Sequence, residues 1–160
     1  MAFDNYTFMA AIQGGLGGSL DVDGEEPFDQ SALQISAGML TQDRTFAIVR
    51  AGRLEFDDDH LFAGRFGAEI EYLNVAGEYR FRQPAYDFGL FLGLGAYRVS
   101  GDPIGSVADE ETALGFVLGA TGDFDMTRHL SVVAEIDFHY ALFDDANLYG
   151  VALAGLAIHF

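Results

Sequence analysis

The most regular feature of the chain is an alternation of apolar and polar positions with a period of two. Between Leu130 and Leu142 every even position is apolar, whereas the odd positions include Glu135, Asp137 and His139. Successive side chains of a β-strand point to opposite faces, so this segment predicts a strand with one apolar and one polar face.

Similar stretches recur along the whole chain and are separated by clusters of Gly, Pro, Asp and Asn. No helical period competes with the alternation, so we interpret the stretches as strands. We expect eight, at about 6–21, 31–41, 45–56, 67–82, 86–100, 112–126, 130–142 and 147–160.

The connections between these strands alternate in length. Longer ones are expected at 22–29, 57–66, 101–111 and 143–147, and short ones at 42–44, 83–85 and 127–129. Alternating long and short connections are typical of strands that run up and down as a meander. The sequence therefore predicts an all-β fold, an eight-stranded antiparallel up-and-down transmembrane β-barrel that forms a single domain over residues 1–160.

Side-chain size indicates which face of the barrel is outside. In the strand expected at 86–100, one row is large and apolar: Phe88, Leu90, Leu92 and Leu94. The opposite row contains Gly89, Gly93 and Gly95. An eight-stranded barrel has a narrow lumen that suits small and polar residues, so the apolar row is expected to face lipid. A soluble, lipocalin-like ligand-binding barrel remains an alternative, because it alternates too but encloses its apolar row.

Two expected strands do not follow this rule. In 45–56, Arg50 shares parity with the apolar residues Phe46 and Ile48. In 67–82, the apolar residues switch from even to odd positions, and a β-bulge near 72–74 would keep them all on one face of the strand. Arg50 is then expected to mark a second bulge or a shifted register.

Composition and charge narrow the classes of function. The chain has 8 basic and 25 acidic residues, a formal net charge of −17 and no cysteine. Such a surface repels nucleic-acid phosphates, so nucleic-acid binding is excluded. No apolar run is long enough for a membrane-spanning helix. Met1-Ala2-Phe3-Asp4 lacks the basic start of a secretory signal, so we expect a mature chain with an added start methionine.

The end of the chain, Gly155-Leu156-Ala157-Ile158-His159-Phe160, and the segment Tyr79-Arg80-Phe81 resemble the small eight-stranded outer-membrane β-barrel family, the OmpA/OmpX-like barrels. The resemblance implies a bacterial outer-membrane protein of the cell envelope with both termini in the periplasm. It also implies that Gly155, Ile158 and Phe160 are read by the barrel-assembly machinery. The absence of tryptophan and lysine departs from the family pattern.

Charged residues on the polar rows predict a network inside the lumen, because an isolated buried ion is strongly unfavourable. Its expected members are Arg50, Arg53, Glu78, Arg80, Arg82, Glu135, Asp137 and His139. We interpret the network as a plug, and exchange of arginine partners would turn it into a gate. An acid–base or metal set on Glu135, Asp137 and His139, with Ser131 and His159, is the alternative, although successive inward residues lie about 7 Å apart.

No enzyme activity and no cofactor are expected. Outer-membrane lipid A deacylases carry a His-x-Ser pair, and the corresponding place here is His139-Tyr140-Ala141, without the nucleophile. Acidic clusters in the longer connections are weak candidates for divalent cations and are more often solvated loop tips. These clusters are Asp57, Asp58, Asp59, Asp109, Glu110 and Glu111.

The sequence thus predicts a monomeric barrel with a structural or surface-interaction role and acidic outer loops. Its expected partners are outer-membrane lipid and the assembly machinery. A barrel subunit docked on a larger envelope complex is the alternative within the membrane, with 86–97 or 147–158 as its contact strand.

Overall fold

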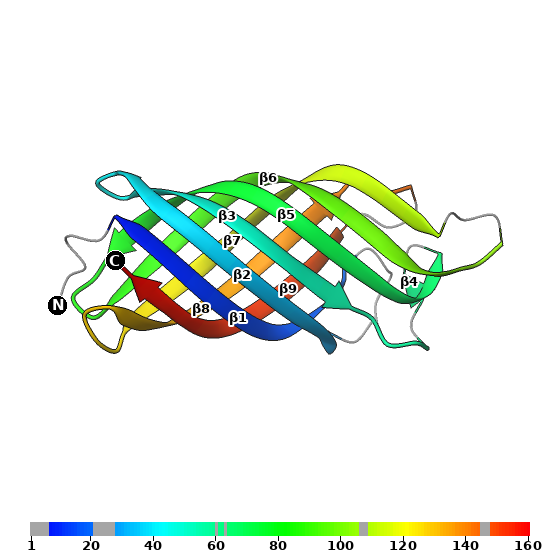
Figure 1. The fold of residues 1–160 in the computed structure, drawn as a ribbon, viewed down its shortest axis with the longest axis horizontal. Helices are drawn as coiled ribbons and strands as arrows, with labels where there is room; N and C mark the ends of the chain where they lie inside the picture. The colour runs from blue at the N-terminus through cyan, green and yellow to red at the C-terminus, as the bar shows by residue number, and fades with distance from the viewer. Residues whose placement is uncertain (1–6, 21–27, 60, 63, 106–108, 145–147) are drawn as a thin grey trace.

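The computed structural model of the 160-residue chain describes residues 7–20, 28–59, 61–62, 64–105, 109–144 and 148–160 (Figure 1). Some sequence-based expectations lie outside these residues. They concern the first four residues and parts of the longer connections expected at 22–29, 57–66, 101–111 and 143–147.

All described secondary structure is extended. The strands are β1 (Phe8–Ser19), β2 (Gln30–Gln42), β3 (Thr45–Glu55), β4 (Leu61–Phe62), β5 (Arg65–Arg82), β6 (Tyr86–Pro103), β7 (Glu110–Asp125), β8 (Leu130–Ala141) and β9 (Leu148–His159). The described residues contain no helix long and apolar enough to cross a membrane.

The strands close into a barrel (Figure 1). Each long strand pairs antiparallel with the next long strand in sequence, and β1 pairs with β9. β3 pairs directly with β5, because the short β4 pairs with the first residues of β5 and does not separate the two strands. The barrel therefore has eight long strands, which confirms the predicted fold class. We call the end that carries Phe160 and the three short connections the turn end. The opposite end, where β4 lies, is the loop end.

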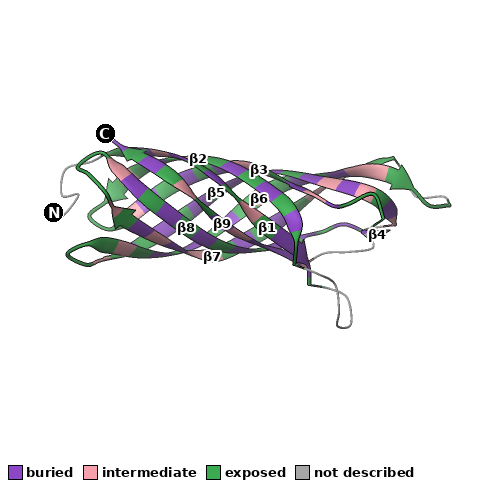
Figure 2. Ribbon diagram, turned by 90° about the horizontal axis from the view of Figure 1, so that it is seen from below, coloured by how far each residue is buried: buried purple, intermediate pink, exposed green. Residues whose placement is uncertain are grey.

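Exposed and buried residues alternate along most strands (Figure 2). The large apolar row of β6, with Leu90, Leu92 and Leu94, is on the outside, and Gly89 and Gly93 face inward. The expected orientation of this strand is confirmed. A belt of exposed apolar side chains runs around the barrel, as the lipid-facing surface of a membrane barrel requires.

Strand β3 differs from the expectation. Phe46, Ile48 and Leu54 are buried together with Arg50, and the β2–β3 ladder is regular from Ser31 to Leu40. Arg50 therefore marks neither a bulge nor a shifted register. The apolar row of β3 faces the lumen, because the lumen itself contains apolar layers.

The bulge predicted near 72–74 is also wrong. The β5–β6 ladder is continuous from Glu69 to Arg82, and its irregularity falls between Phe66 and Glu69. Ile70 and Tyr72 are buried inside the barrel. The apolar residues of β5 change from even to odd positions because Ile70 and Tyr72 face an apolar part of the lumen, and the strand itself is regular there.

Three apolar clusters of described residues fill the lumen, with polar side chains between and beside them, and the smallest cluster consists of Ala76, Phe91 and Val117. The loop-end cluster is large: Ala32, Leu54, Phe56, Phe62, Ala68, Ile70, Tyr72, Tyr97, Val99, Ala141, Phe143, Tyr149, Val151 and Leu153. The turn-end cluster is smaller: Met9, Ala11, Phe46, Ile48, Val133 and Ala157. The lumen is thus layered, and buried ion pairs lie alongside apolar clusters that the expectation of a polar plug did not include.

Candidate functional site

Arg50 of β3 is the centre of the charged network in the lumen. Its Nε donates to Oε1 of Glu135 on β8 at 2.9 Å, and its Nη2 donates to Oε2 of Glu78 on β5 at 3.2 Å. The guanidinium carbon lies 3.9 Å from the centroid of the Phe91 ring. Arg50 is thus held by two carboxylates and one aromatic face, a geometry in which each ion is compensated.

Arg80 continues the network toward the turn end. Its Nε donates to Oε1 of Glu78 at 2.6 Å, and its Nη1 donates to Oδ2 of Asp123 at 3.1 Å. The guanidinium also lies over the Phe46 ring at 4.5 Å. Glu78 therefore joins two arginines, so the charged side chains of β3, β5, β7 and β8 form one connected unit.

Near the turn end, Asp123 meets His159 and Ser131. Oδ2 of Asp123 lies 3.2 Å from Nε2 of His159, and Oγ of Ser131 lies 2.9 Å from the same nitrogen. A nucleophilic triad needs the serine and the carboxylate on opposite nitrogens of the imidazole. This cluster lacks that arrangement and is a hydrogen-bonded end of the network.

Two glutamines extend the network sideways. Nε2 of Gln34 donates to Oε1 of Glu135 at 2.8 Å and to Oε1 of Gln13 at 3.2 Å. The hydroxyl of Tyr72 donates to Oε1 of Gln34 at 2.8 Å. A continuous series of hydrogen bonds thus connects Tyr72, through Gln34, with the charged side chains near the turn end.

His139 lies on the loop-end side of the charges, within a group of tyrosines. Its ring stacks on Tyr149 with a centroid distance of 4.6 Å and an interplanar angle of 1°, and Tyr72 lies 4.7 Å away. The Tyr97 hydroxyl is 3.1 Å from Nδ1, and Oδ2 of Asp137 is 3.6 Å from Nε2. Asp137 and His139 therefore approach more closely than their spacing along the strand implies.

Glycine makes room for the lumenal rings. A Cβ on Gly119 would overlap the Phe91 ring, and one on Gly52 would overlap the Tyr72 hydroxyl. Eight strands enclose little volume, so a large ring on one strand needs a small neighbour on the next. The inward-facing glycines thus leave the space that the aromatic rings in the lumen occupy.

Arg53 does not belong to the network. It lies on the outer face of β3, its side chain is 52% exposed, and its Nη1 is 3.1 Å from Oε1 of Glu55. Arg50 and Arg53 are three positions apart, so a regular strand must place them on opposite faces. The predicted lumenal position of Arg53 is therefore wrong. Arg82 lies at the turn end of β5 and is half-buried.

The acidic loop residues do not form a metal centre in the described part of the chain, which holds no group of three or more His, Cys, Asp or Glu side chains suited to a metal ion. Glu110 pairs with the exposed Arg98 of β6, and Oε1 of Glu111 accepts the backbone N–H of Asp144 at 2.9 Å. Asp57, Asp58, Asp59 and Asp109 are exposed.

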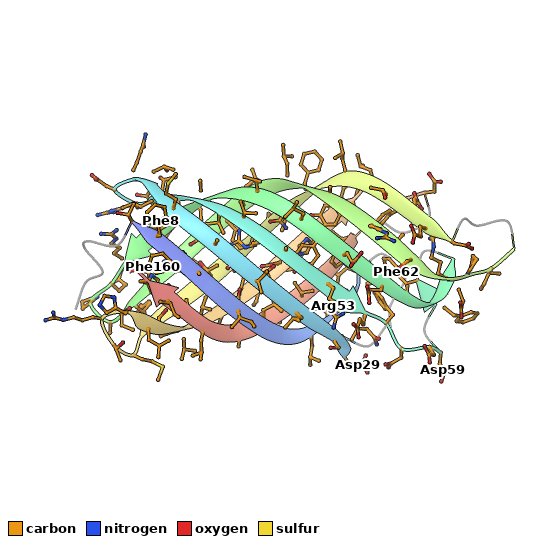
Figure 3. The ribbon with its side chains drawn as sticks, viewed as in Figure 1. Phe8, Asp29, Arg53, Asp59, Phe62 and Phe160 are labelled. Atoms are coloured by element: carbon orange, nitrogen blue, oxygen red, sulfur yellow. The ribbon has the colours of Figure 1, made fainter. Side chains whose placement is uncertain are left out.

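The residues of the expected assembly signal lie on the closing strand. Ile158 and Phe160 are exposed on the outer face, and the Phe160 ring stacks against Phe8 of β1 with a centroid distance of 6.3 Å (Figure 3). Gly155 pairs with Gln13, and a Cβ there would overlap the backbone of Ile12. This glycine therefore allows the first and last strands to approach closely.

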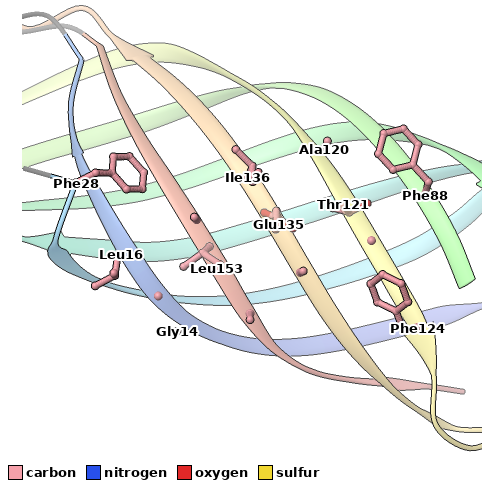
Figure 4. Close-up of a pocket in the computed structure, with 15 residues that line it drawn as sticks. Gly14, Leu16, Phe28, Phe88, Ala120, Thr121, Phe124, Glu135, Ile136 and Leu153 are labelled. Carbon is pink, nitrogen blue, oxygen red and sulfur yellow. The ribbon is translucent and has the colours of Figure 1, made fainter.

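The outer wall over β1, β9, β8 and β7 is hollowed by a shallow groove of about 650 Å³ (Figure 4). Its floor is a row of small residues that pair strand to strand, in the order Gly14, Ala154, Ala134 and Gly122. Phe88 and Leu33 continue the row at its two ends. We call this feature the small-residue groove.

Several members of the lumenal site were not among the predicted residues. They are Gln13, Gln34, Tyr72, Asn74, Tyr97, Asp123 and Tyr149. Each stands on the inward row of its strand, so the period-two pattern was the signal that could have found them. The pattern could not show which of them make contact, since the contacts join distant strands.

Comparison with known proteins supports the architecture. No protein-family profile matches the sequence, and no curated protein matches it. Among solved structures, Neisserial surface protein A is similar with a TM-score of 0.74 and 16% identity over 96% of this chain and 97% of that chain. OprG of Pseudomonas aeruginosa has a TM-score of 0.62 and 13% identity over 100% of this chain and 99% of that chain.

Ail of Yersinia pestis is similar with a TM-score of 0.57 and 15% identity over 96% of this chain and 99% of that chain. All three proteins are small outer-membrane barrels. The chain has the same fold as these barrels, which confirms the predicted resemblance at the level of architecture. At these low sequence identities, the similarity establishes the fold and no specific function.

Proposed function

We propose that this chain is a bacterial outer-membrane barrel with a structural or surface-interaction role, monomeric, with both termini on the periplasmic side. The observation that carries the proposal is the combination of an apolar outer belt with a lumen filled by side chains. A soluble ligand-binding barrel needs the reverse, an apolar interior around a cavity and a polar outside. We therefore do not propose that alternative.

The packed interior supports a closed barrel and argues against a porin. The apolar clusters and the Arg50–Glu78–Arg80 chain occupy the lumen. We expect the refolded protein to give a heat-dependent mobility shift on an SDS gel and no steady conductance in a planar bilayer. A stable open channel in the majority of insertions would contradict the closed barrel. A missing mobility shift, with a monomer soluble in plain buffer, would contradict the membrane assignment itself.

The loop end supports a surface role with partners of positive charge. Asp57, Asp58, Asp59, Asp109 and Asp144 are exposed there. Ail has been solved in complex with the heparin analogue sucrose octasulfate, a polyanion. Acidic loops repel polyanions, so we propose that this chain instead engages cationic partners or divalent cations that bridge to neighbouring lipid.

We propose that Phe160 serves assembly more than stability, because its ring is exposed and contacts Phe8 at the outer surface. For Phe160→Ala we expect a several-fold loss of folded barrel in cell envelopes, with nearly unchanged unfolding of the protein refolded in vitro. Phe81→Ala is the matched control, since Phe81 is also an exposed aromatic near the turn end. Equal yields for the two variants would remove the assembly role.

The chemistry of the lumen gives no support for an enzyme. Near the turn end, Ser131 and Asp123 both contact Nε2 of His159 and not opposite ring nitrogens, and the second histidine–carboxylate pair, His139 with Asp137, is enclosed by tyrosines. We accordingly propose a non-enzymatic role that needs no cofactor.

A barrel subunit of a larger envelope complex is the second candidate, and the small-residue groove favours it. Small residues let another membrane element approach closely, and the groove includes Ala152 and Ala154 of the strand expected as a contact surface. Site-directed photo-crosslinking from Ala134 in intact envelopes tests this idea. A discrete protein adduct would support a complex, whereas adducts with lipid alone would leave the monomer as the better account.

A further inference from the structure

The small-residue groove is bounded by larger side chains on both sides. Two positions toward the turn end from its floor, a row of exposed apolar residues runs parallel to the floor and forms a ridge: Ile12, Leu156, Val132 and Phe124. Toward the loop end, Leu16 and Ile136 are exposed and line the other side. Four neighbouring strands therefore share one indentation of the outer wall.

The groove lies within the apolar belt, and the lining side chains that reach the surface are apolar. Phe28 and Leu16 lie at one end of it, and Phe88 and Phe124 lie at the other (Figure 4). Its polar lining residues, Thr121 and Glu135, are each 4% exposed, so their polar groups face the lumen. A polar ligand would lose its hydrogen bonds in this place, and the groove therefore suits hydrocarbon.

The width of the groove favours a hydrocarbon chain over a helix. Outward side chains on one strand are about 7 Å apart, so the rows on the two sides of the floor are about 14 Å apart at the level of the backbone. Their side chains fill part of this width. A helix with its side chains is about 10–12 Å across and would not reach the floor. An acyl chain is thin and flexible, so it can gain dispersion contacts from the floor and from both sides.

The turn end offers a contact of the opposite kind. Strands β7 and β8 supply half of the floor, and the turn that joins them carries the exposed Arg128 and His129. Phe124 lines the groove, and the exposed Met126 follows it toward this turn. A guanidinium binds phosphate oxygens through paired hydrogen bonds, and basic groups at a membrane surface attract anionic headgroups. The loop end carries exposed acids instead, so an anionic headgroup is favoured at the turn end.

We propose that the small-residue groove binds one acyl chain of an anionic glycerophospholipid, and that Arg128 binds the phosphate of the same molecule. The apolar floor holds the tail, and the β7–β8 turn holds the head. The site depends on the outer-membrane location that we propose for the chain, and it places the lipid in the leaflet at the turn end. The bound lipid differs from the surrounding lipid by its longer residence time.

Native mass spectrometry of the full chain, refolded in detergent with dioleoylphosphatidylglycerol, tests the tail site. We expect the wild-type protein to retain one lipid molecule. Ala134→Leu fills the middle of the floor, so the retained lipid should decrease several-fold. Ala96→Leu is the matched control, because Ala96 is also an exposed outward alanine but pairs with Leu73 and Leu114 outside the groove. Equal retention by the two variants would overturn the site, and so would a protein dimer without lipid.

The head contact is tested by competition between dioleoylphosphatidylglycerol and the zwitterionic dioleoylphosphatidylcholine. The wild-type protein should retain the anionic lipid in preference, and Arg128→Gln should lose this preference. Arg44→Gln is the matched control, since Arg44 is exposed in the β2–β3 turn, away from the groove. The same preference in both variants would remove Arg128 from the site.

A measurement on the wild-type protein keeps the test independent of how the variants fold. Phosphatidylglycerol with a spin label on its acyl chain should broaden the methyl NMR signals of Ala134 and Ala154 several-fold more than that of Ala96. Equal broadening would mean that only ordinary surrounding lipid is present and would overturn the proposal. The heat-dependent mobility shift of the same sample shows that the barrel has formed, so failure of the lipid site is distinguished from failure of the membrane assignment.

Discussion

Replacement of Arg50 by methionine is expected to destabilise the barrel by roughly 3–5 kcal/mol, the usual cost of leaving a buried charge without its partner. Glu78 would keep Arg80, whereas Glu135 would lose its arginine and keep the neutral amide of Gln34. The measurement is the urea dependence of the folded, fast-migrating form on SDS gels after refolding into lipid vesicles.

Arg53→Met is the matched control for this prediction. Arg53 stands on the same strand, but its side chain is 52% exposed and pairs only with Glu55. A surface change of this kind usually shifts stability by less than about 0.5 kcal/mol. The double variant Arg50→Met/Glu135→Leu should recover part of the loss, because it removes the uncompensated charge as well. Equal losses for Arg50→Met and Arg53→Met would contradict the lumenal network.

Leu92→Arg is expected to destabilise the barrel in a bilayer by about 2–4 kcal/mol, the cost reported for an arginine near the membrane midplane. Leu92 is 64% exposed on β6, and it pairs with Gly77 and Leu118 in the middle of the two ladders. The same vesicle unfolding experiment measures the loss.

Ile104→Arg is the control, because Ile104 is an exposed apolar residue just beyond β6 at the loop end. Near or outside the interface the cost of an arginine falls to about 0–1 kcal/mol. If Leu92→Arg left stability unchanged or increased solubility in plain buffer, the belt would face water and the membrane assignment would fail.

The outward-facing rows of β6 and β8 could be predicted because one face of each strand carries large apolar residues, whereas the other carries small or charged residues. In β8, Glu135, Asp137 and His139 alternate with large apolar residues, so only one orientation avoids charge in lipid. In β3 both rows are largely apolar, and the sequence held no comparable contrast. The orientation of β3 became clear only when closure of the barrel placed Phe46 and Ile48 in the turn-end cluster.

The contacts within the charged network could not be predicted from the local pattern of the sequence. Arg50 and Glu135 are 85 residues apart, and Arg80 and Asp123 are 43 apart. An inward row offers each arginine several carboxylates, and the choice among them depends on strand order, tilt and register. The short strand β4, which pairs with the first residues of β5, falls within the connection expected at 57–66.

The sequence by itself determined the strand number, the antiparallel meander and the outward face of the clearly two-sided strands, because a period of two is a local property of extended backbone. Tertiary structure alone decided which side chains share a layer of the lumen, where apolar clusters interrupt the charges, and that Arg53 lies outside. The reason is physical: burial and charge pairing inside a closed barrel depend on residues brought together from opposite strands, and no local pattern contains that information.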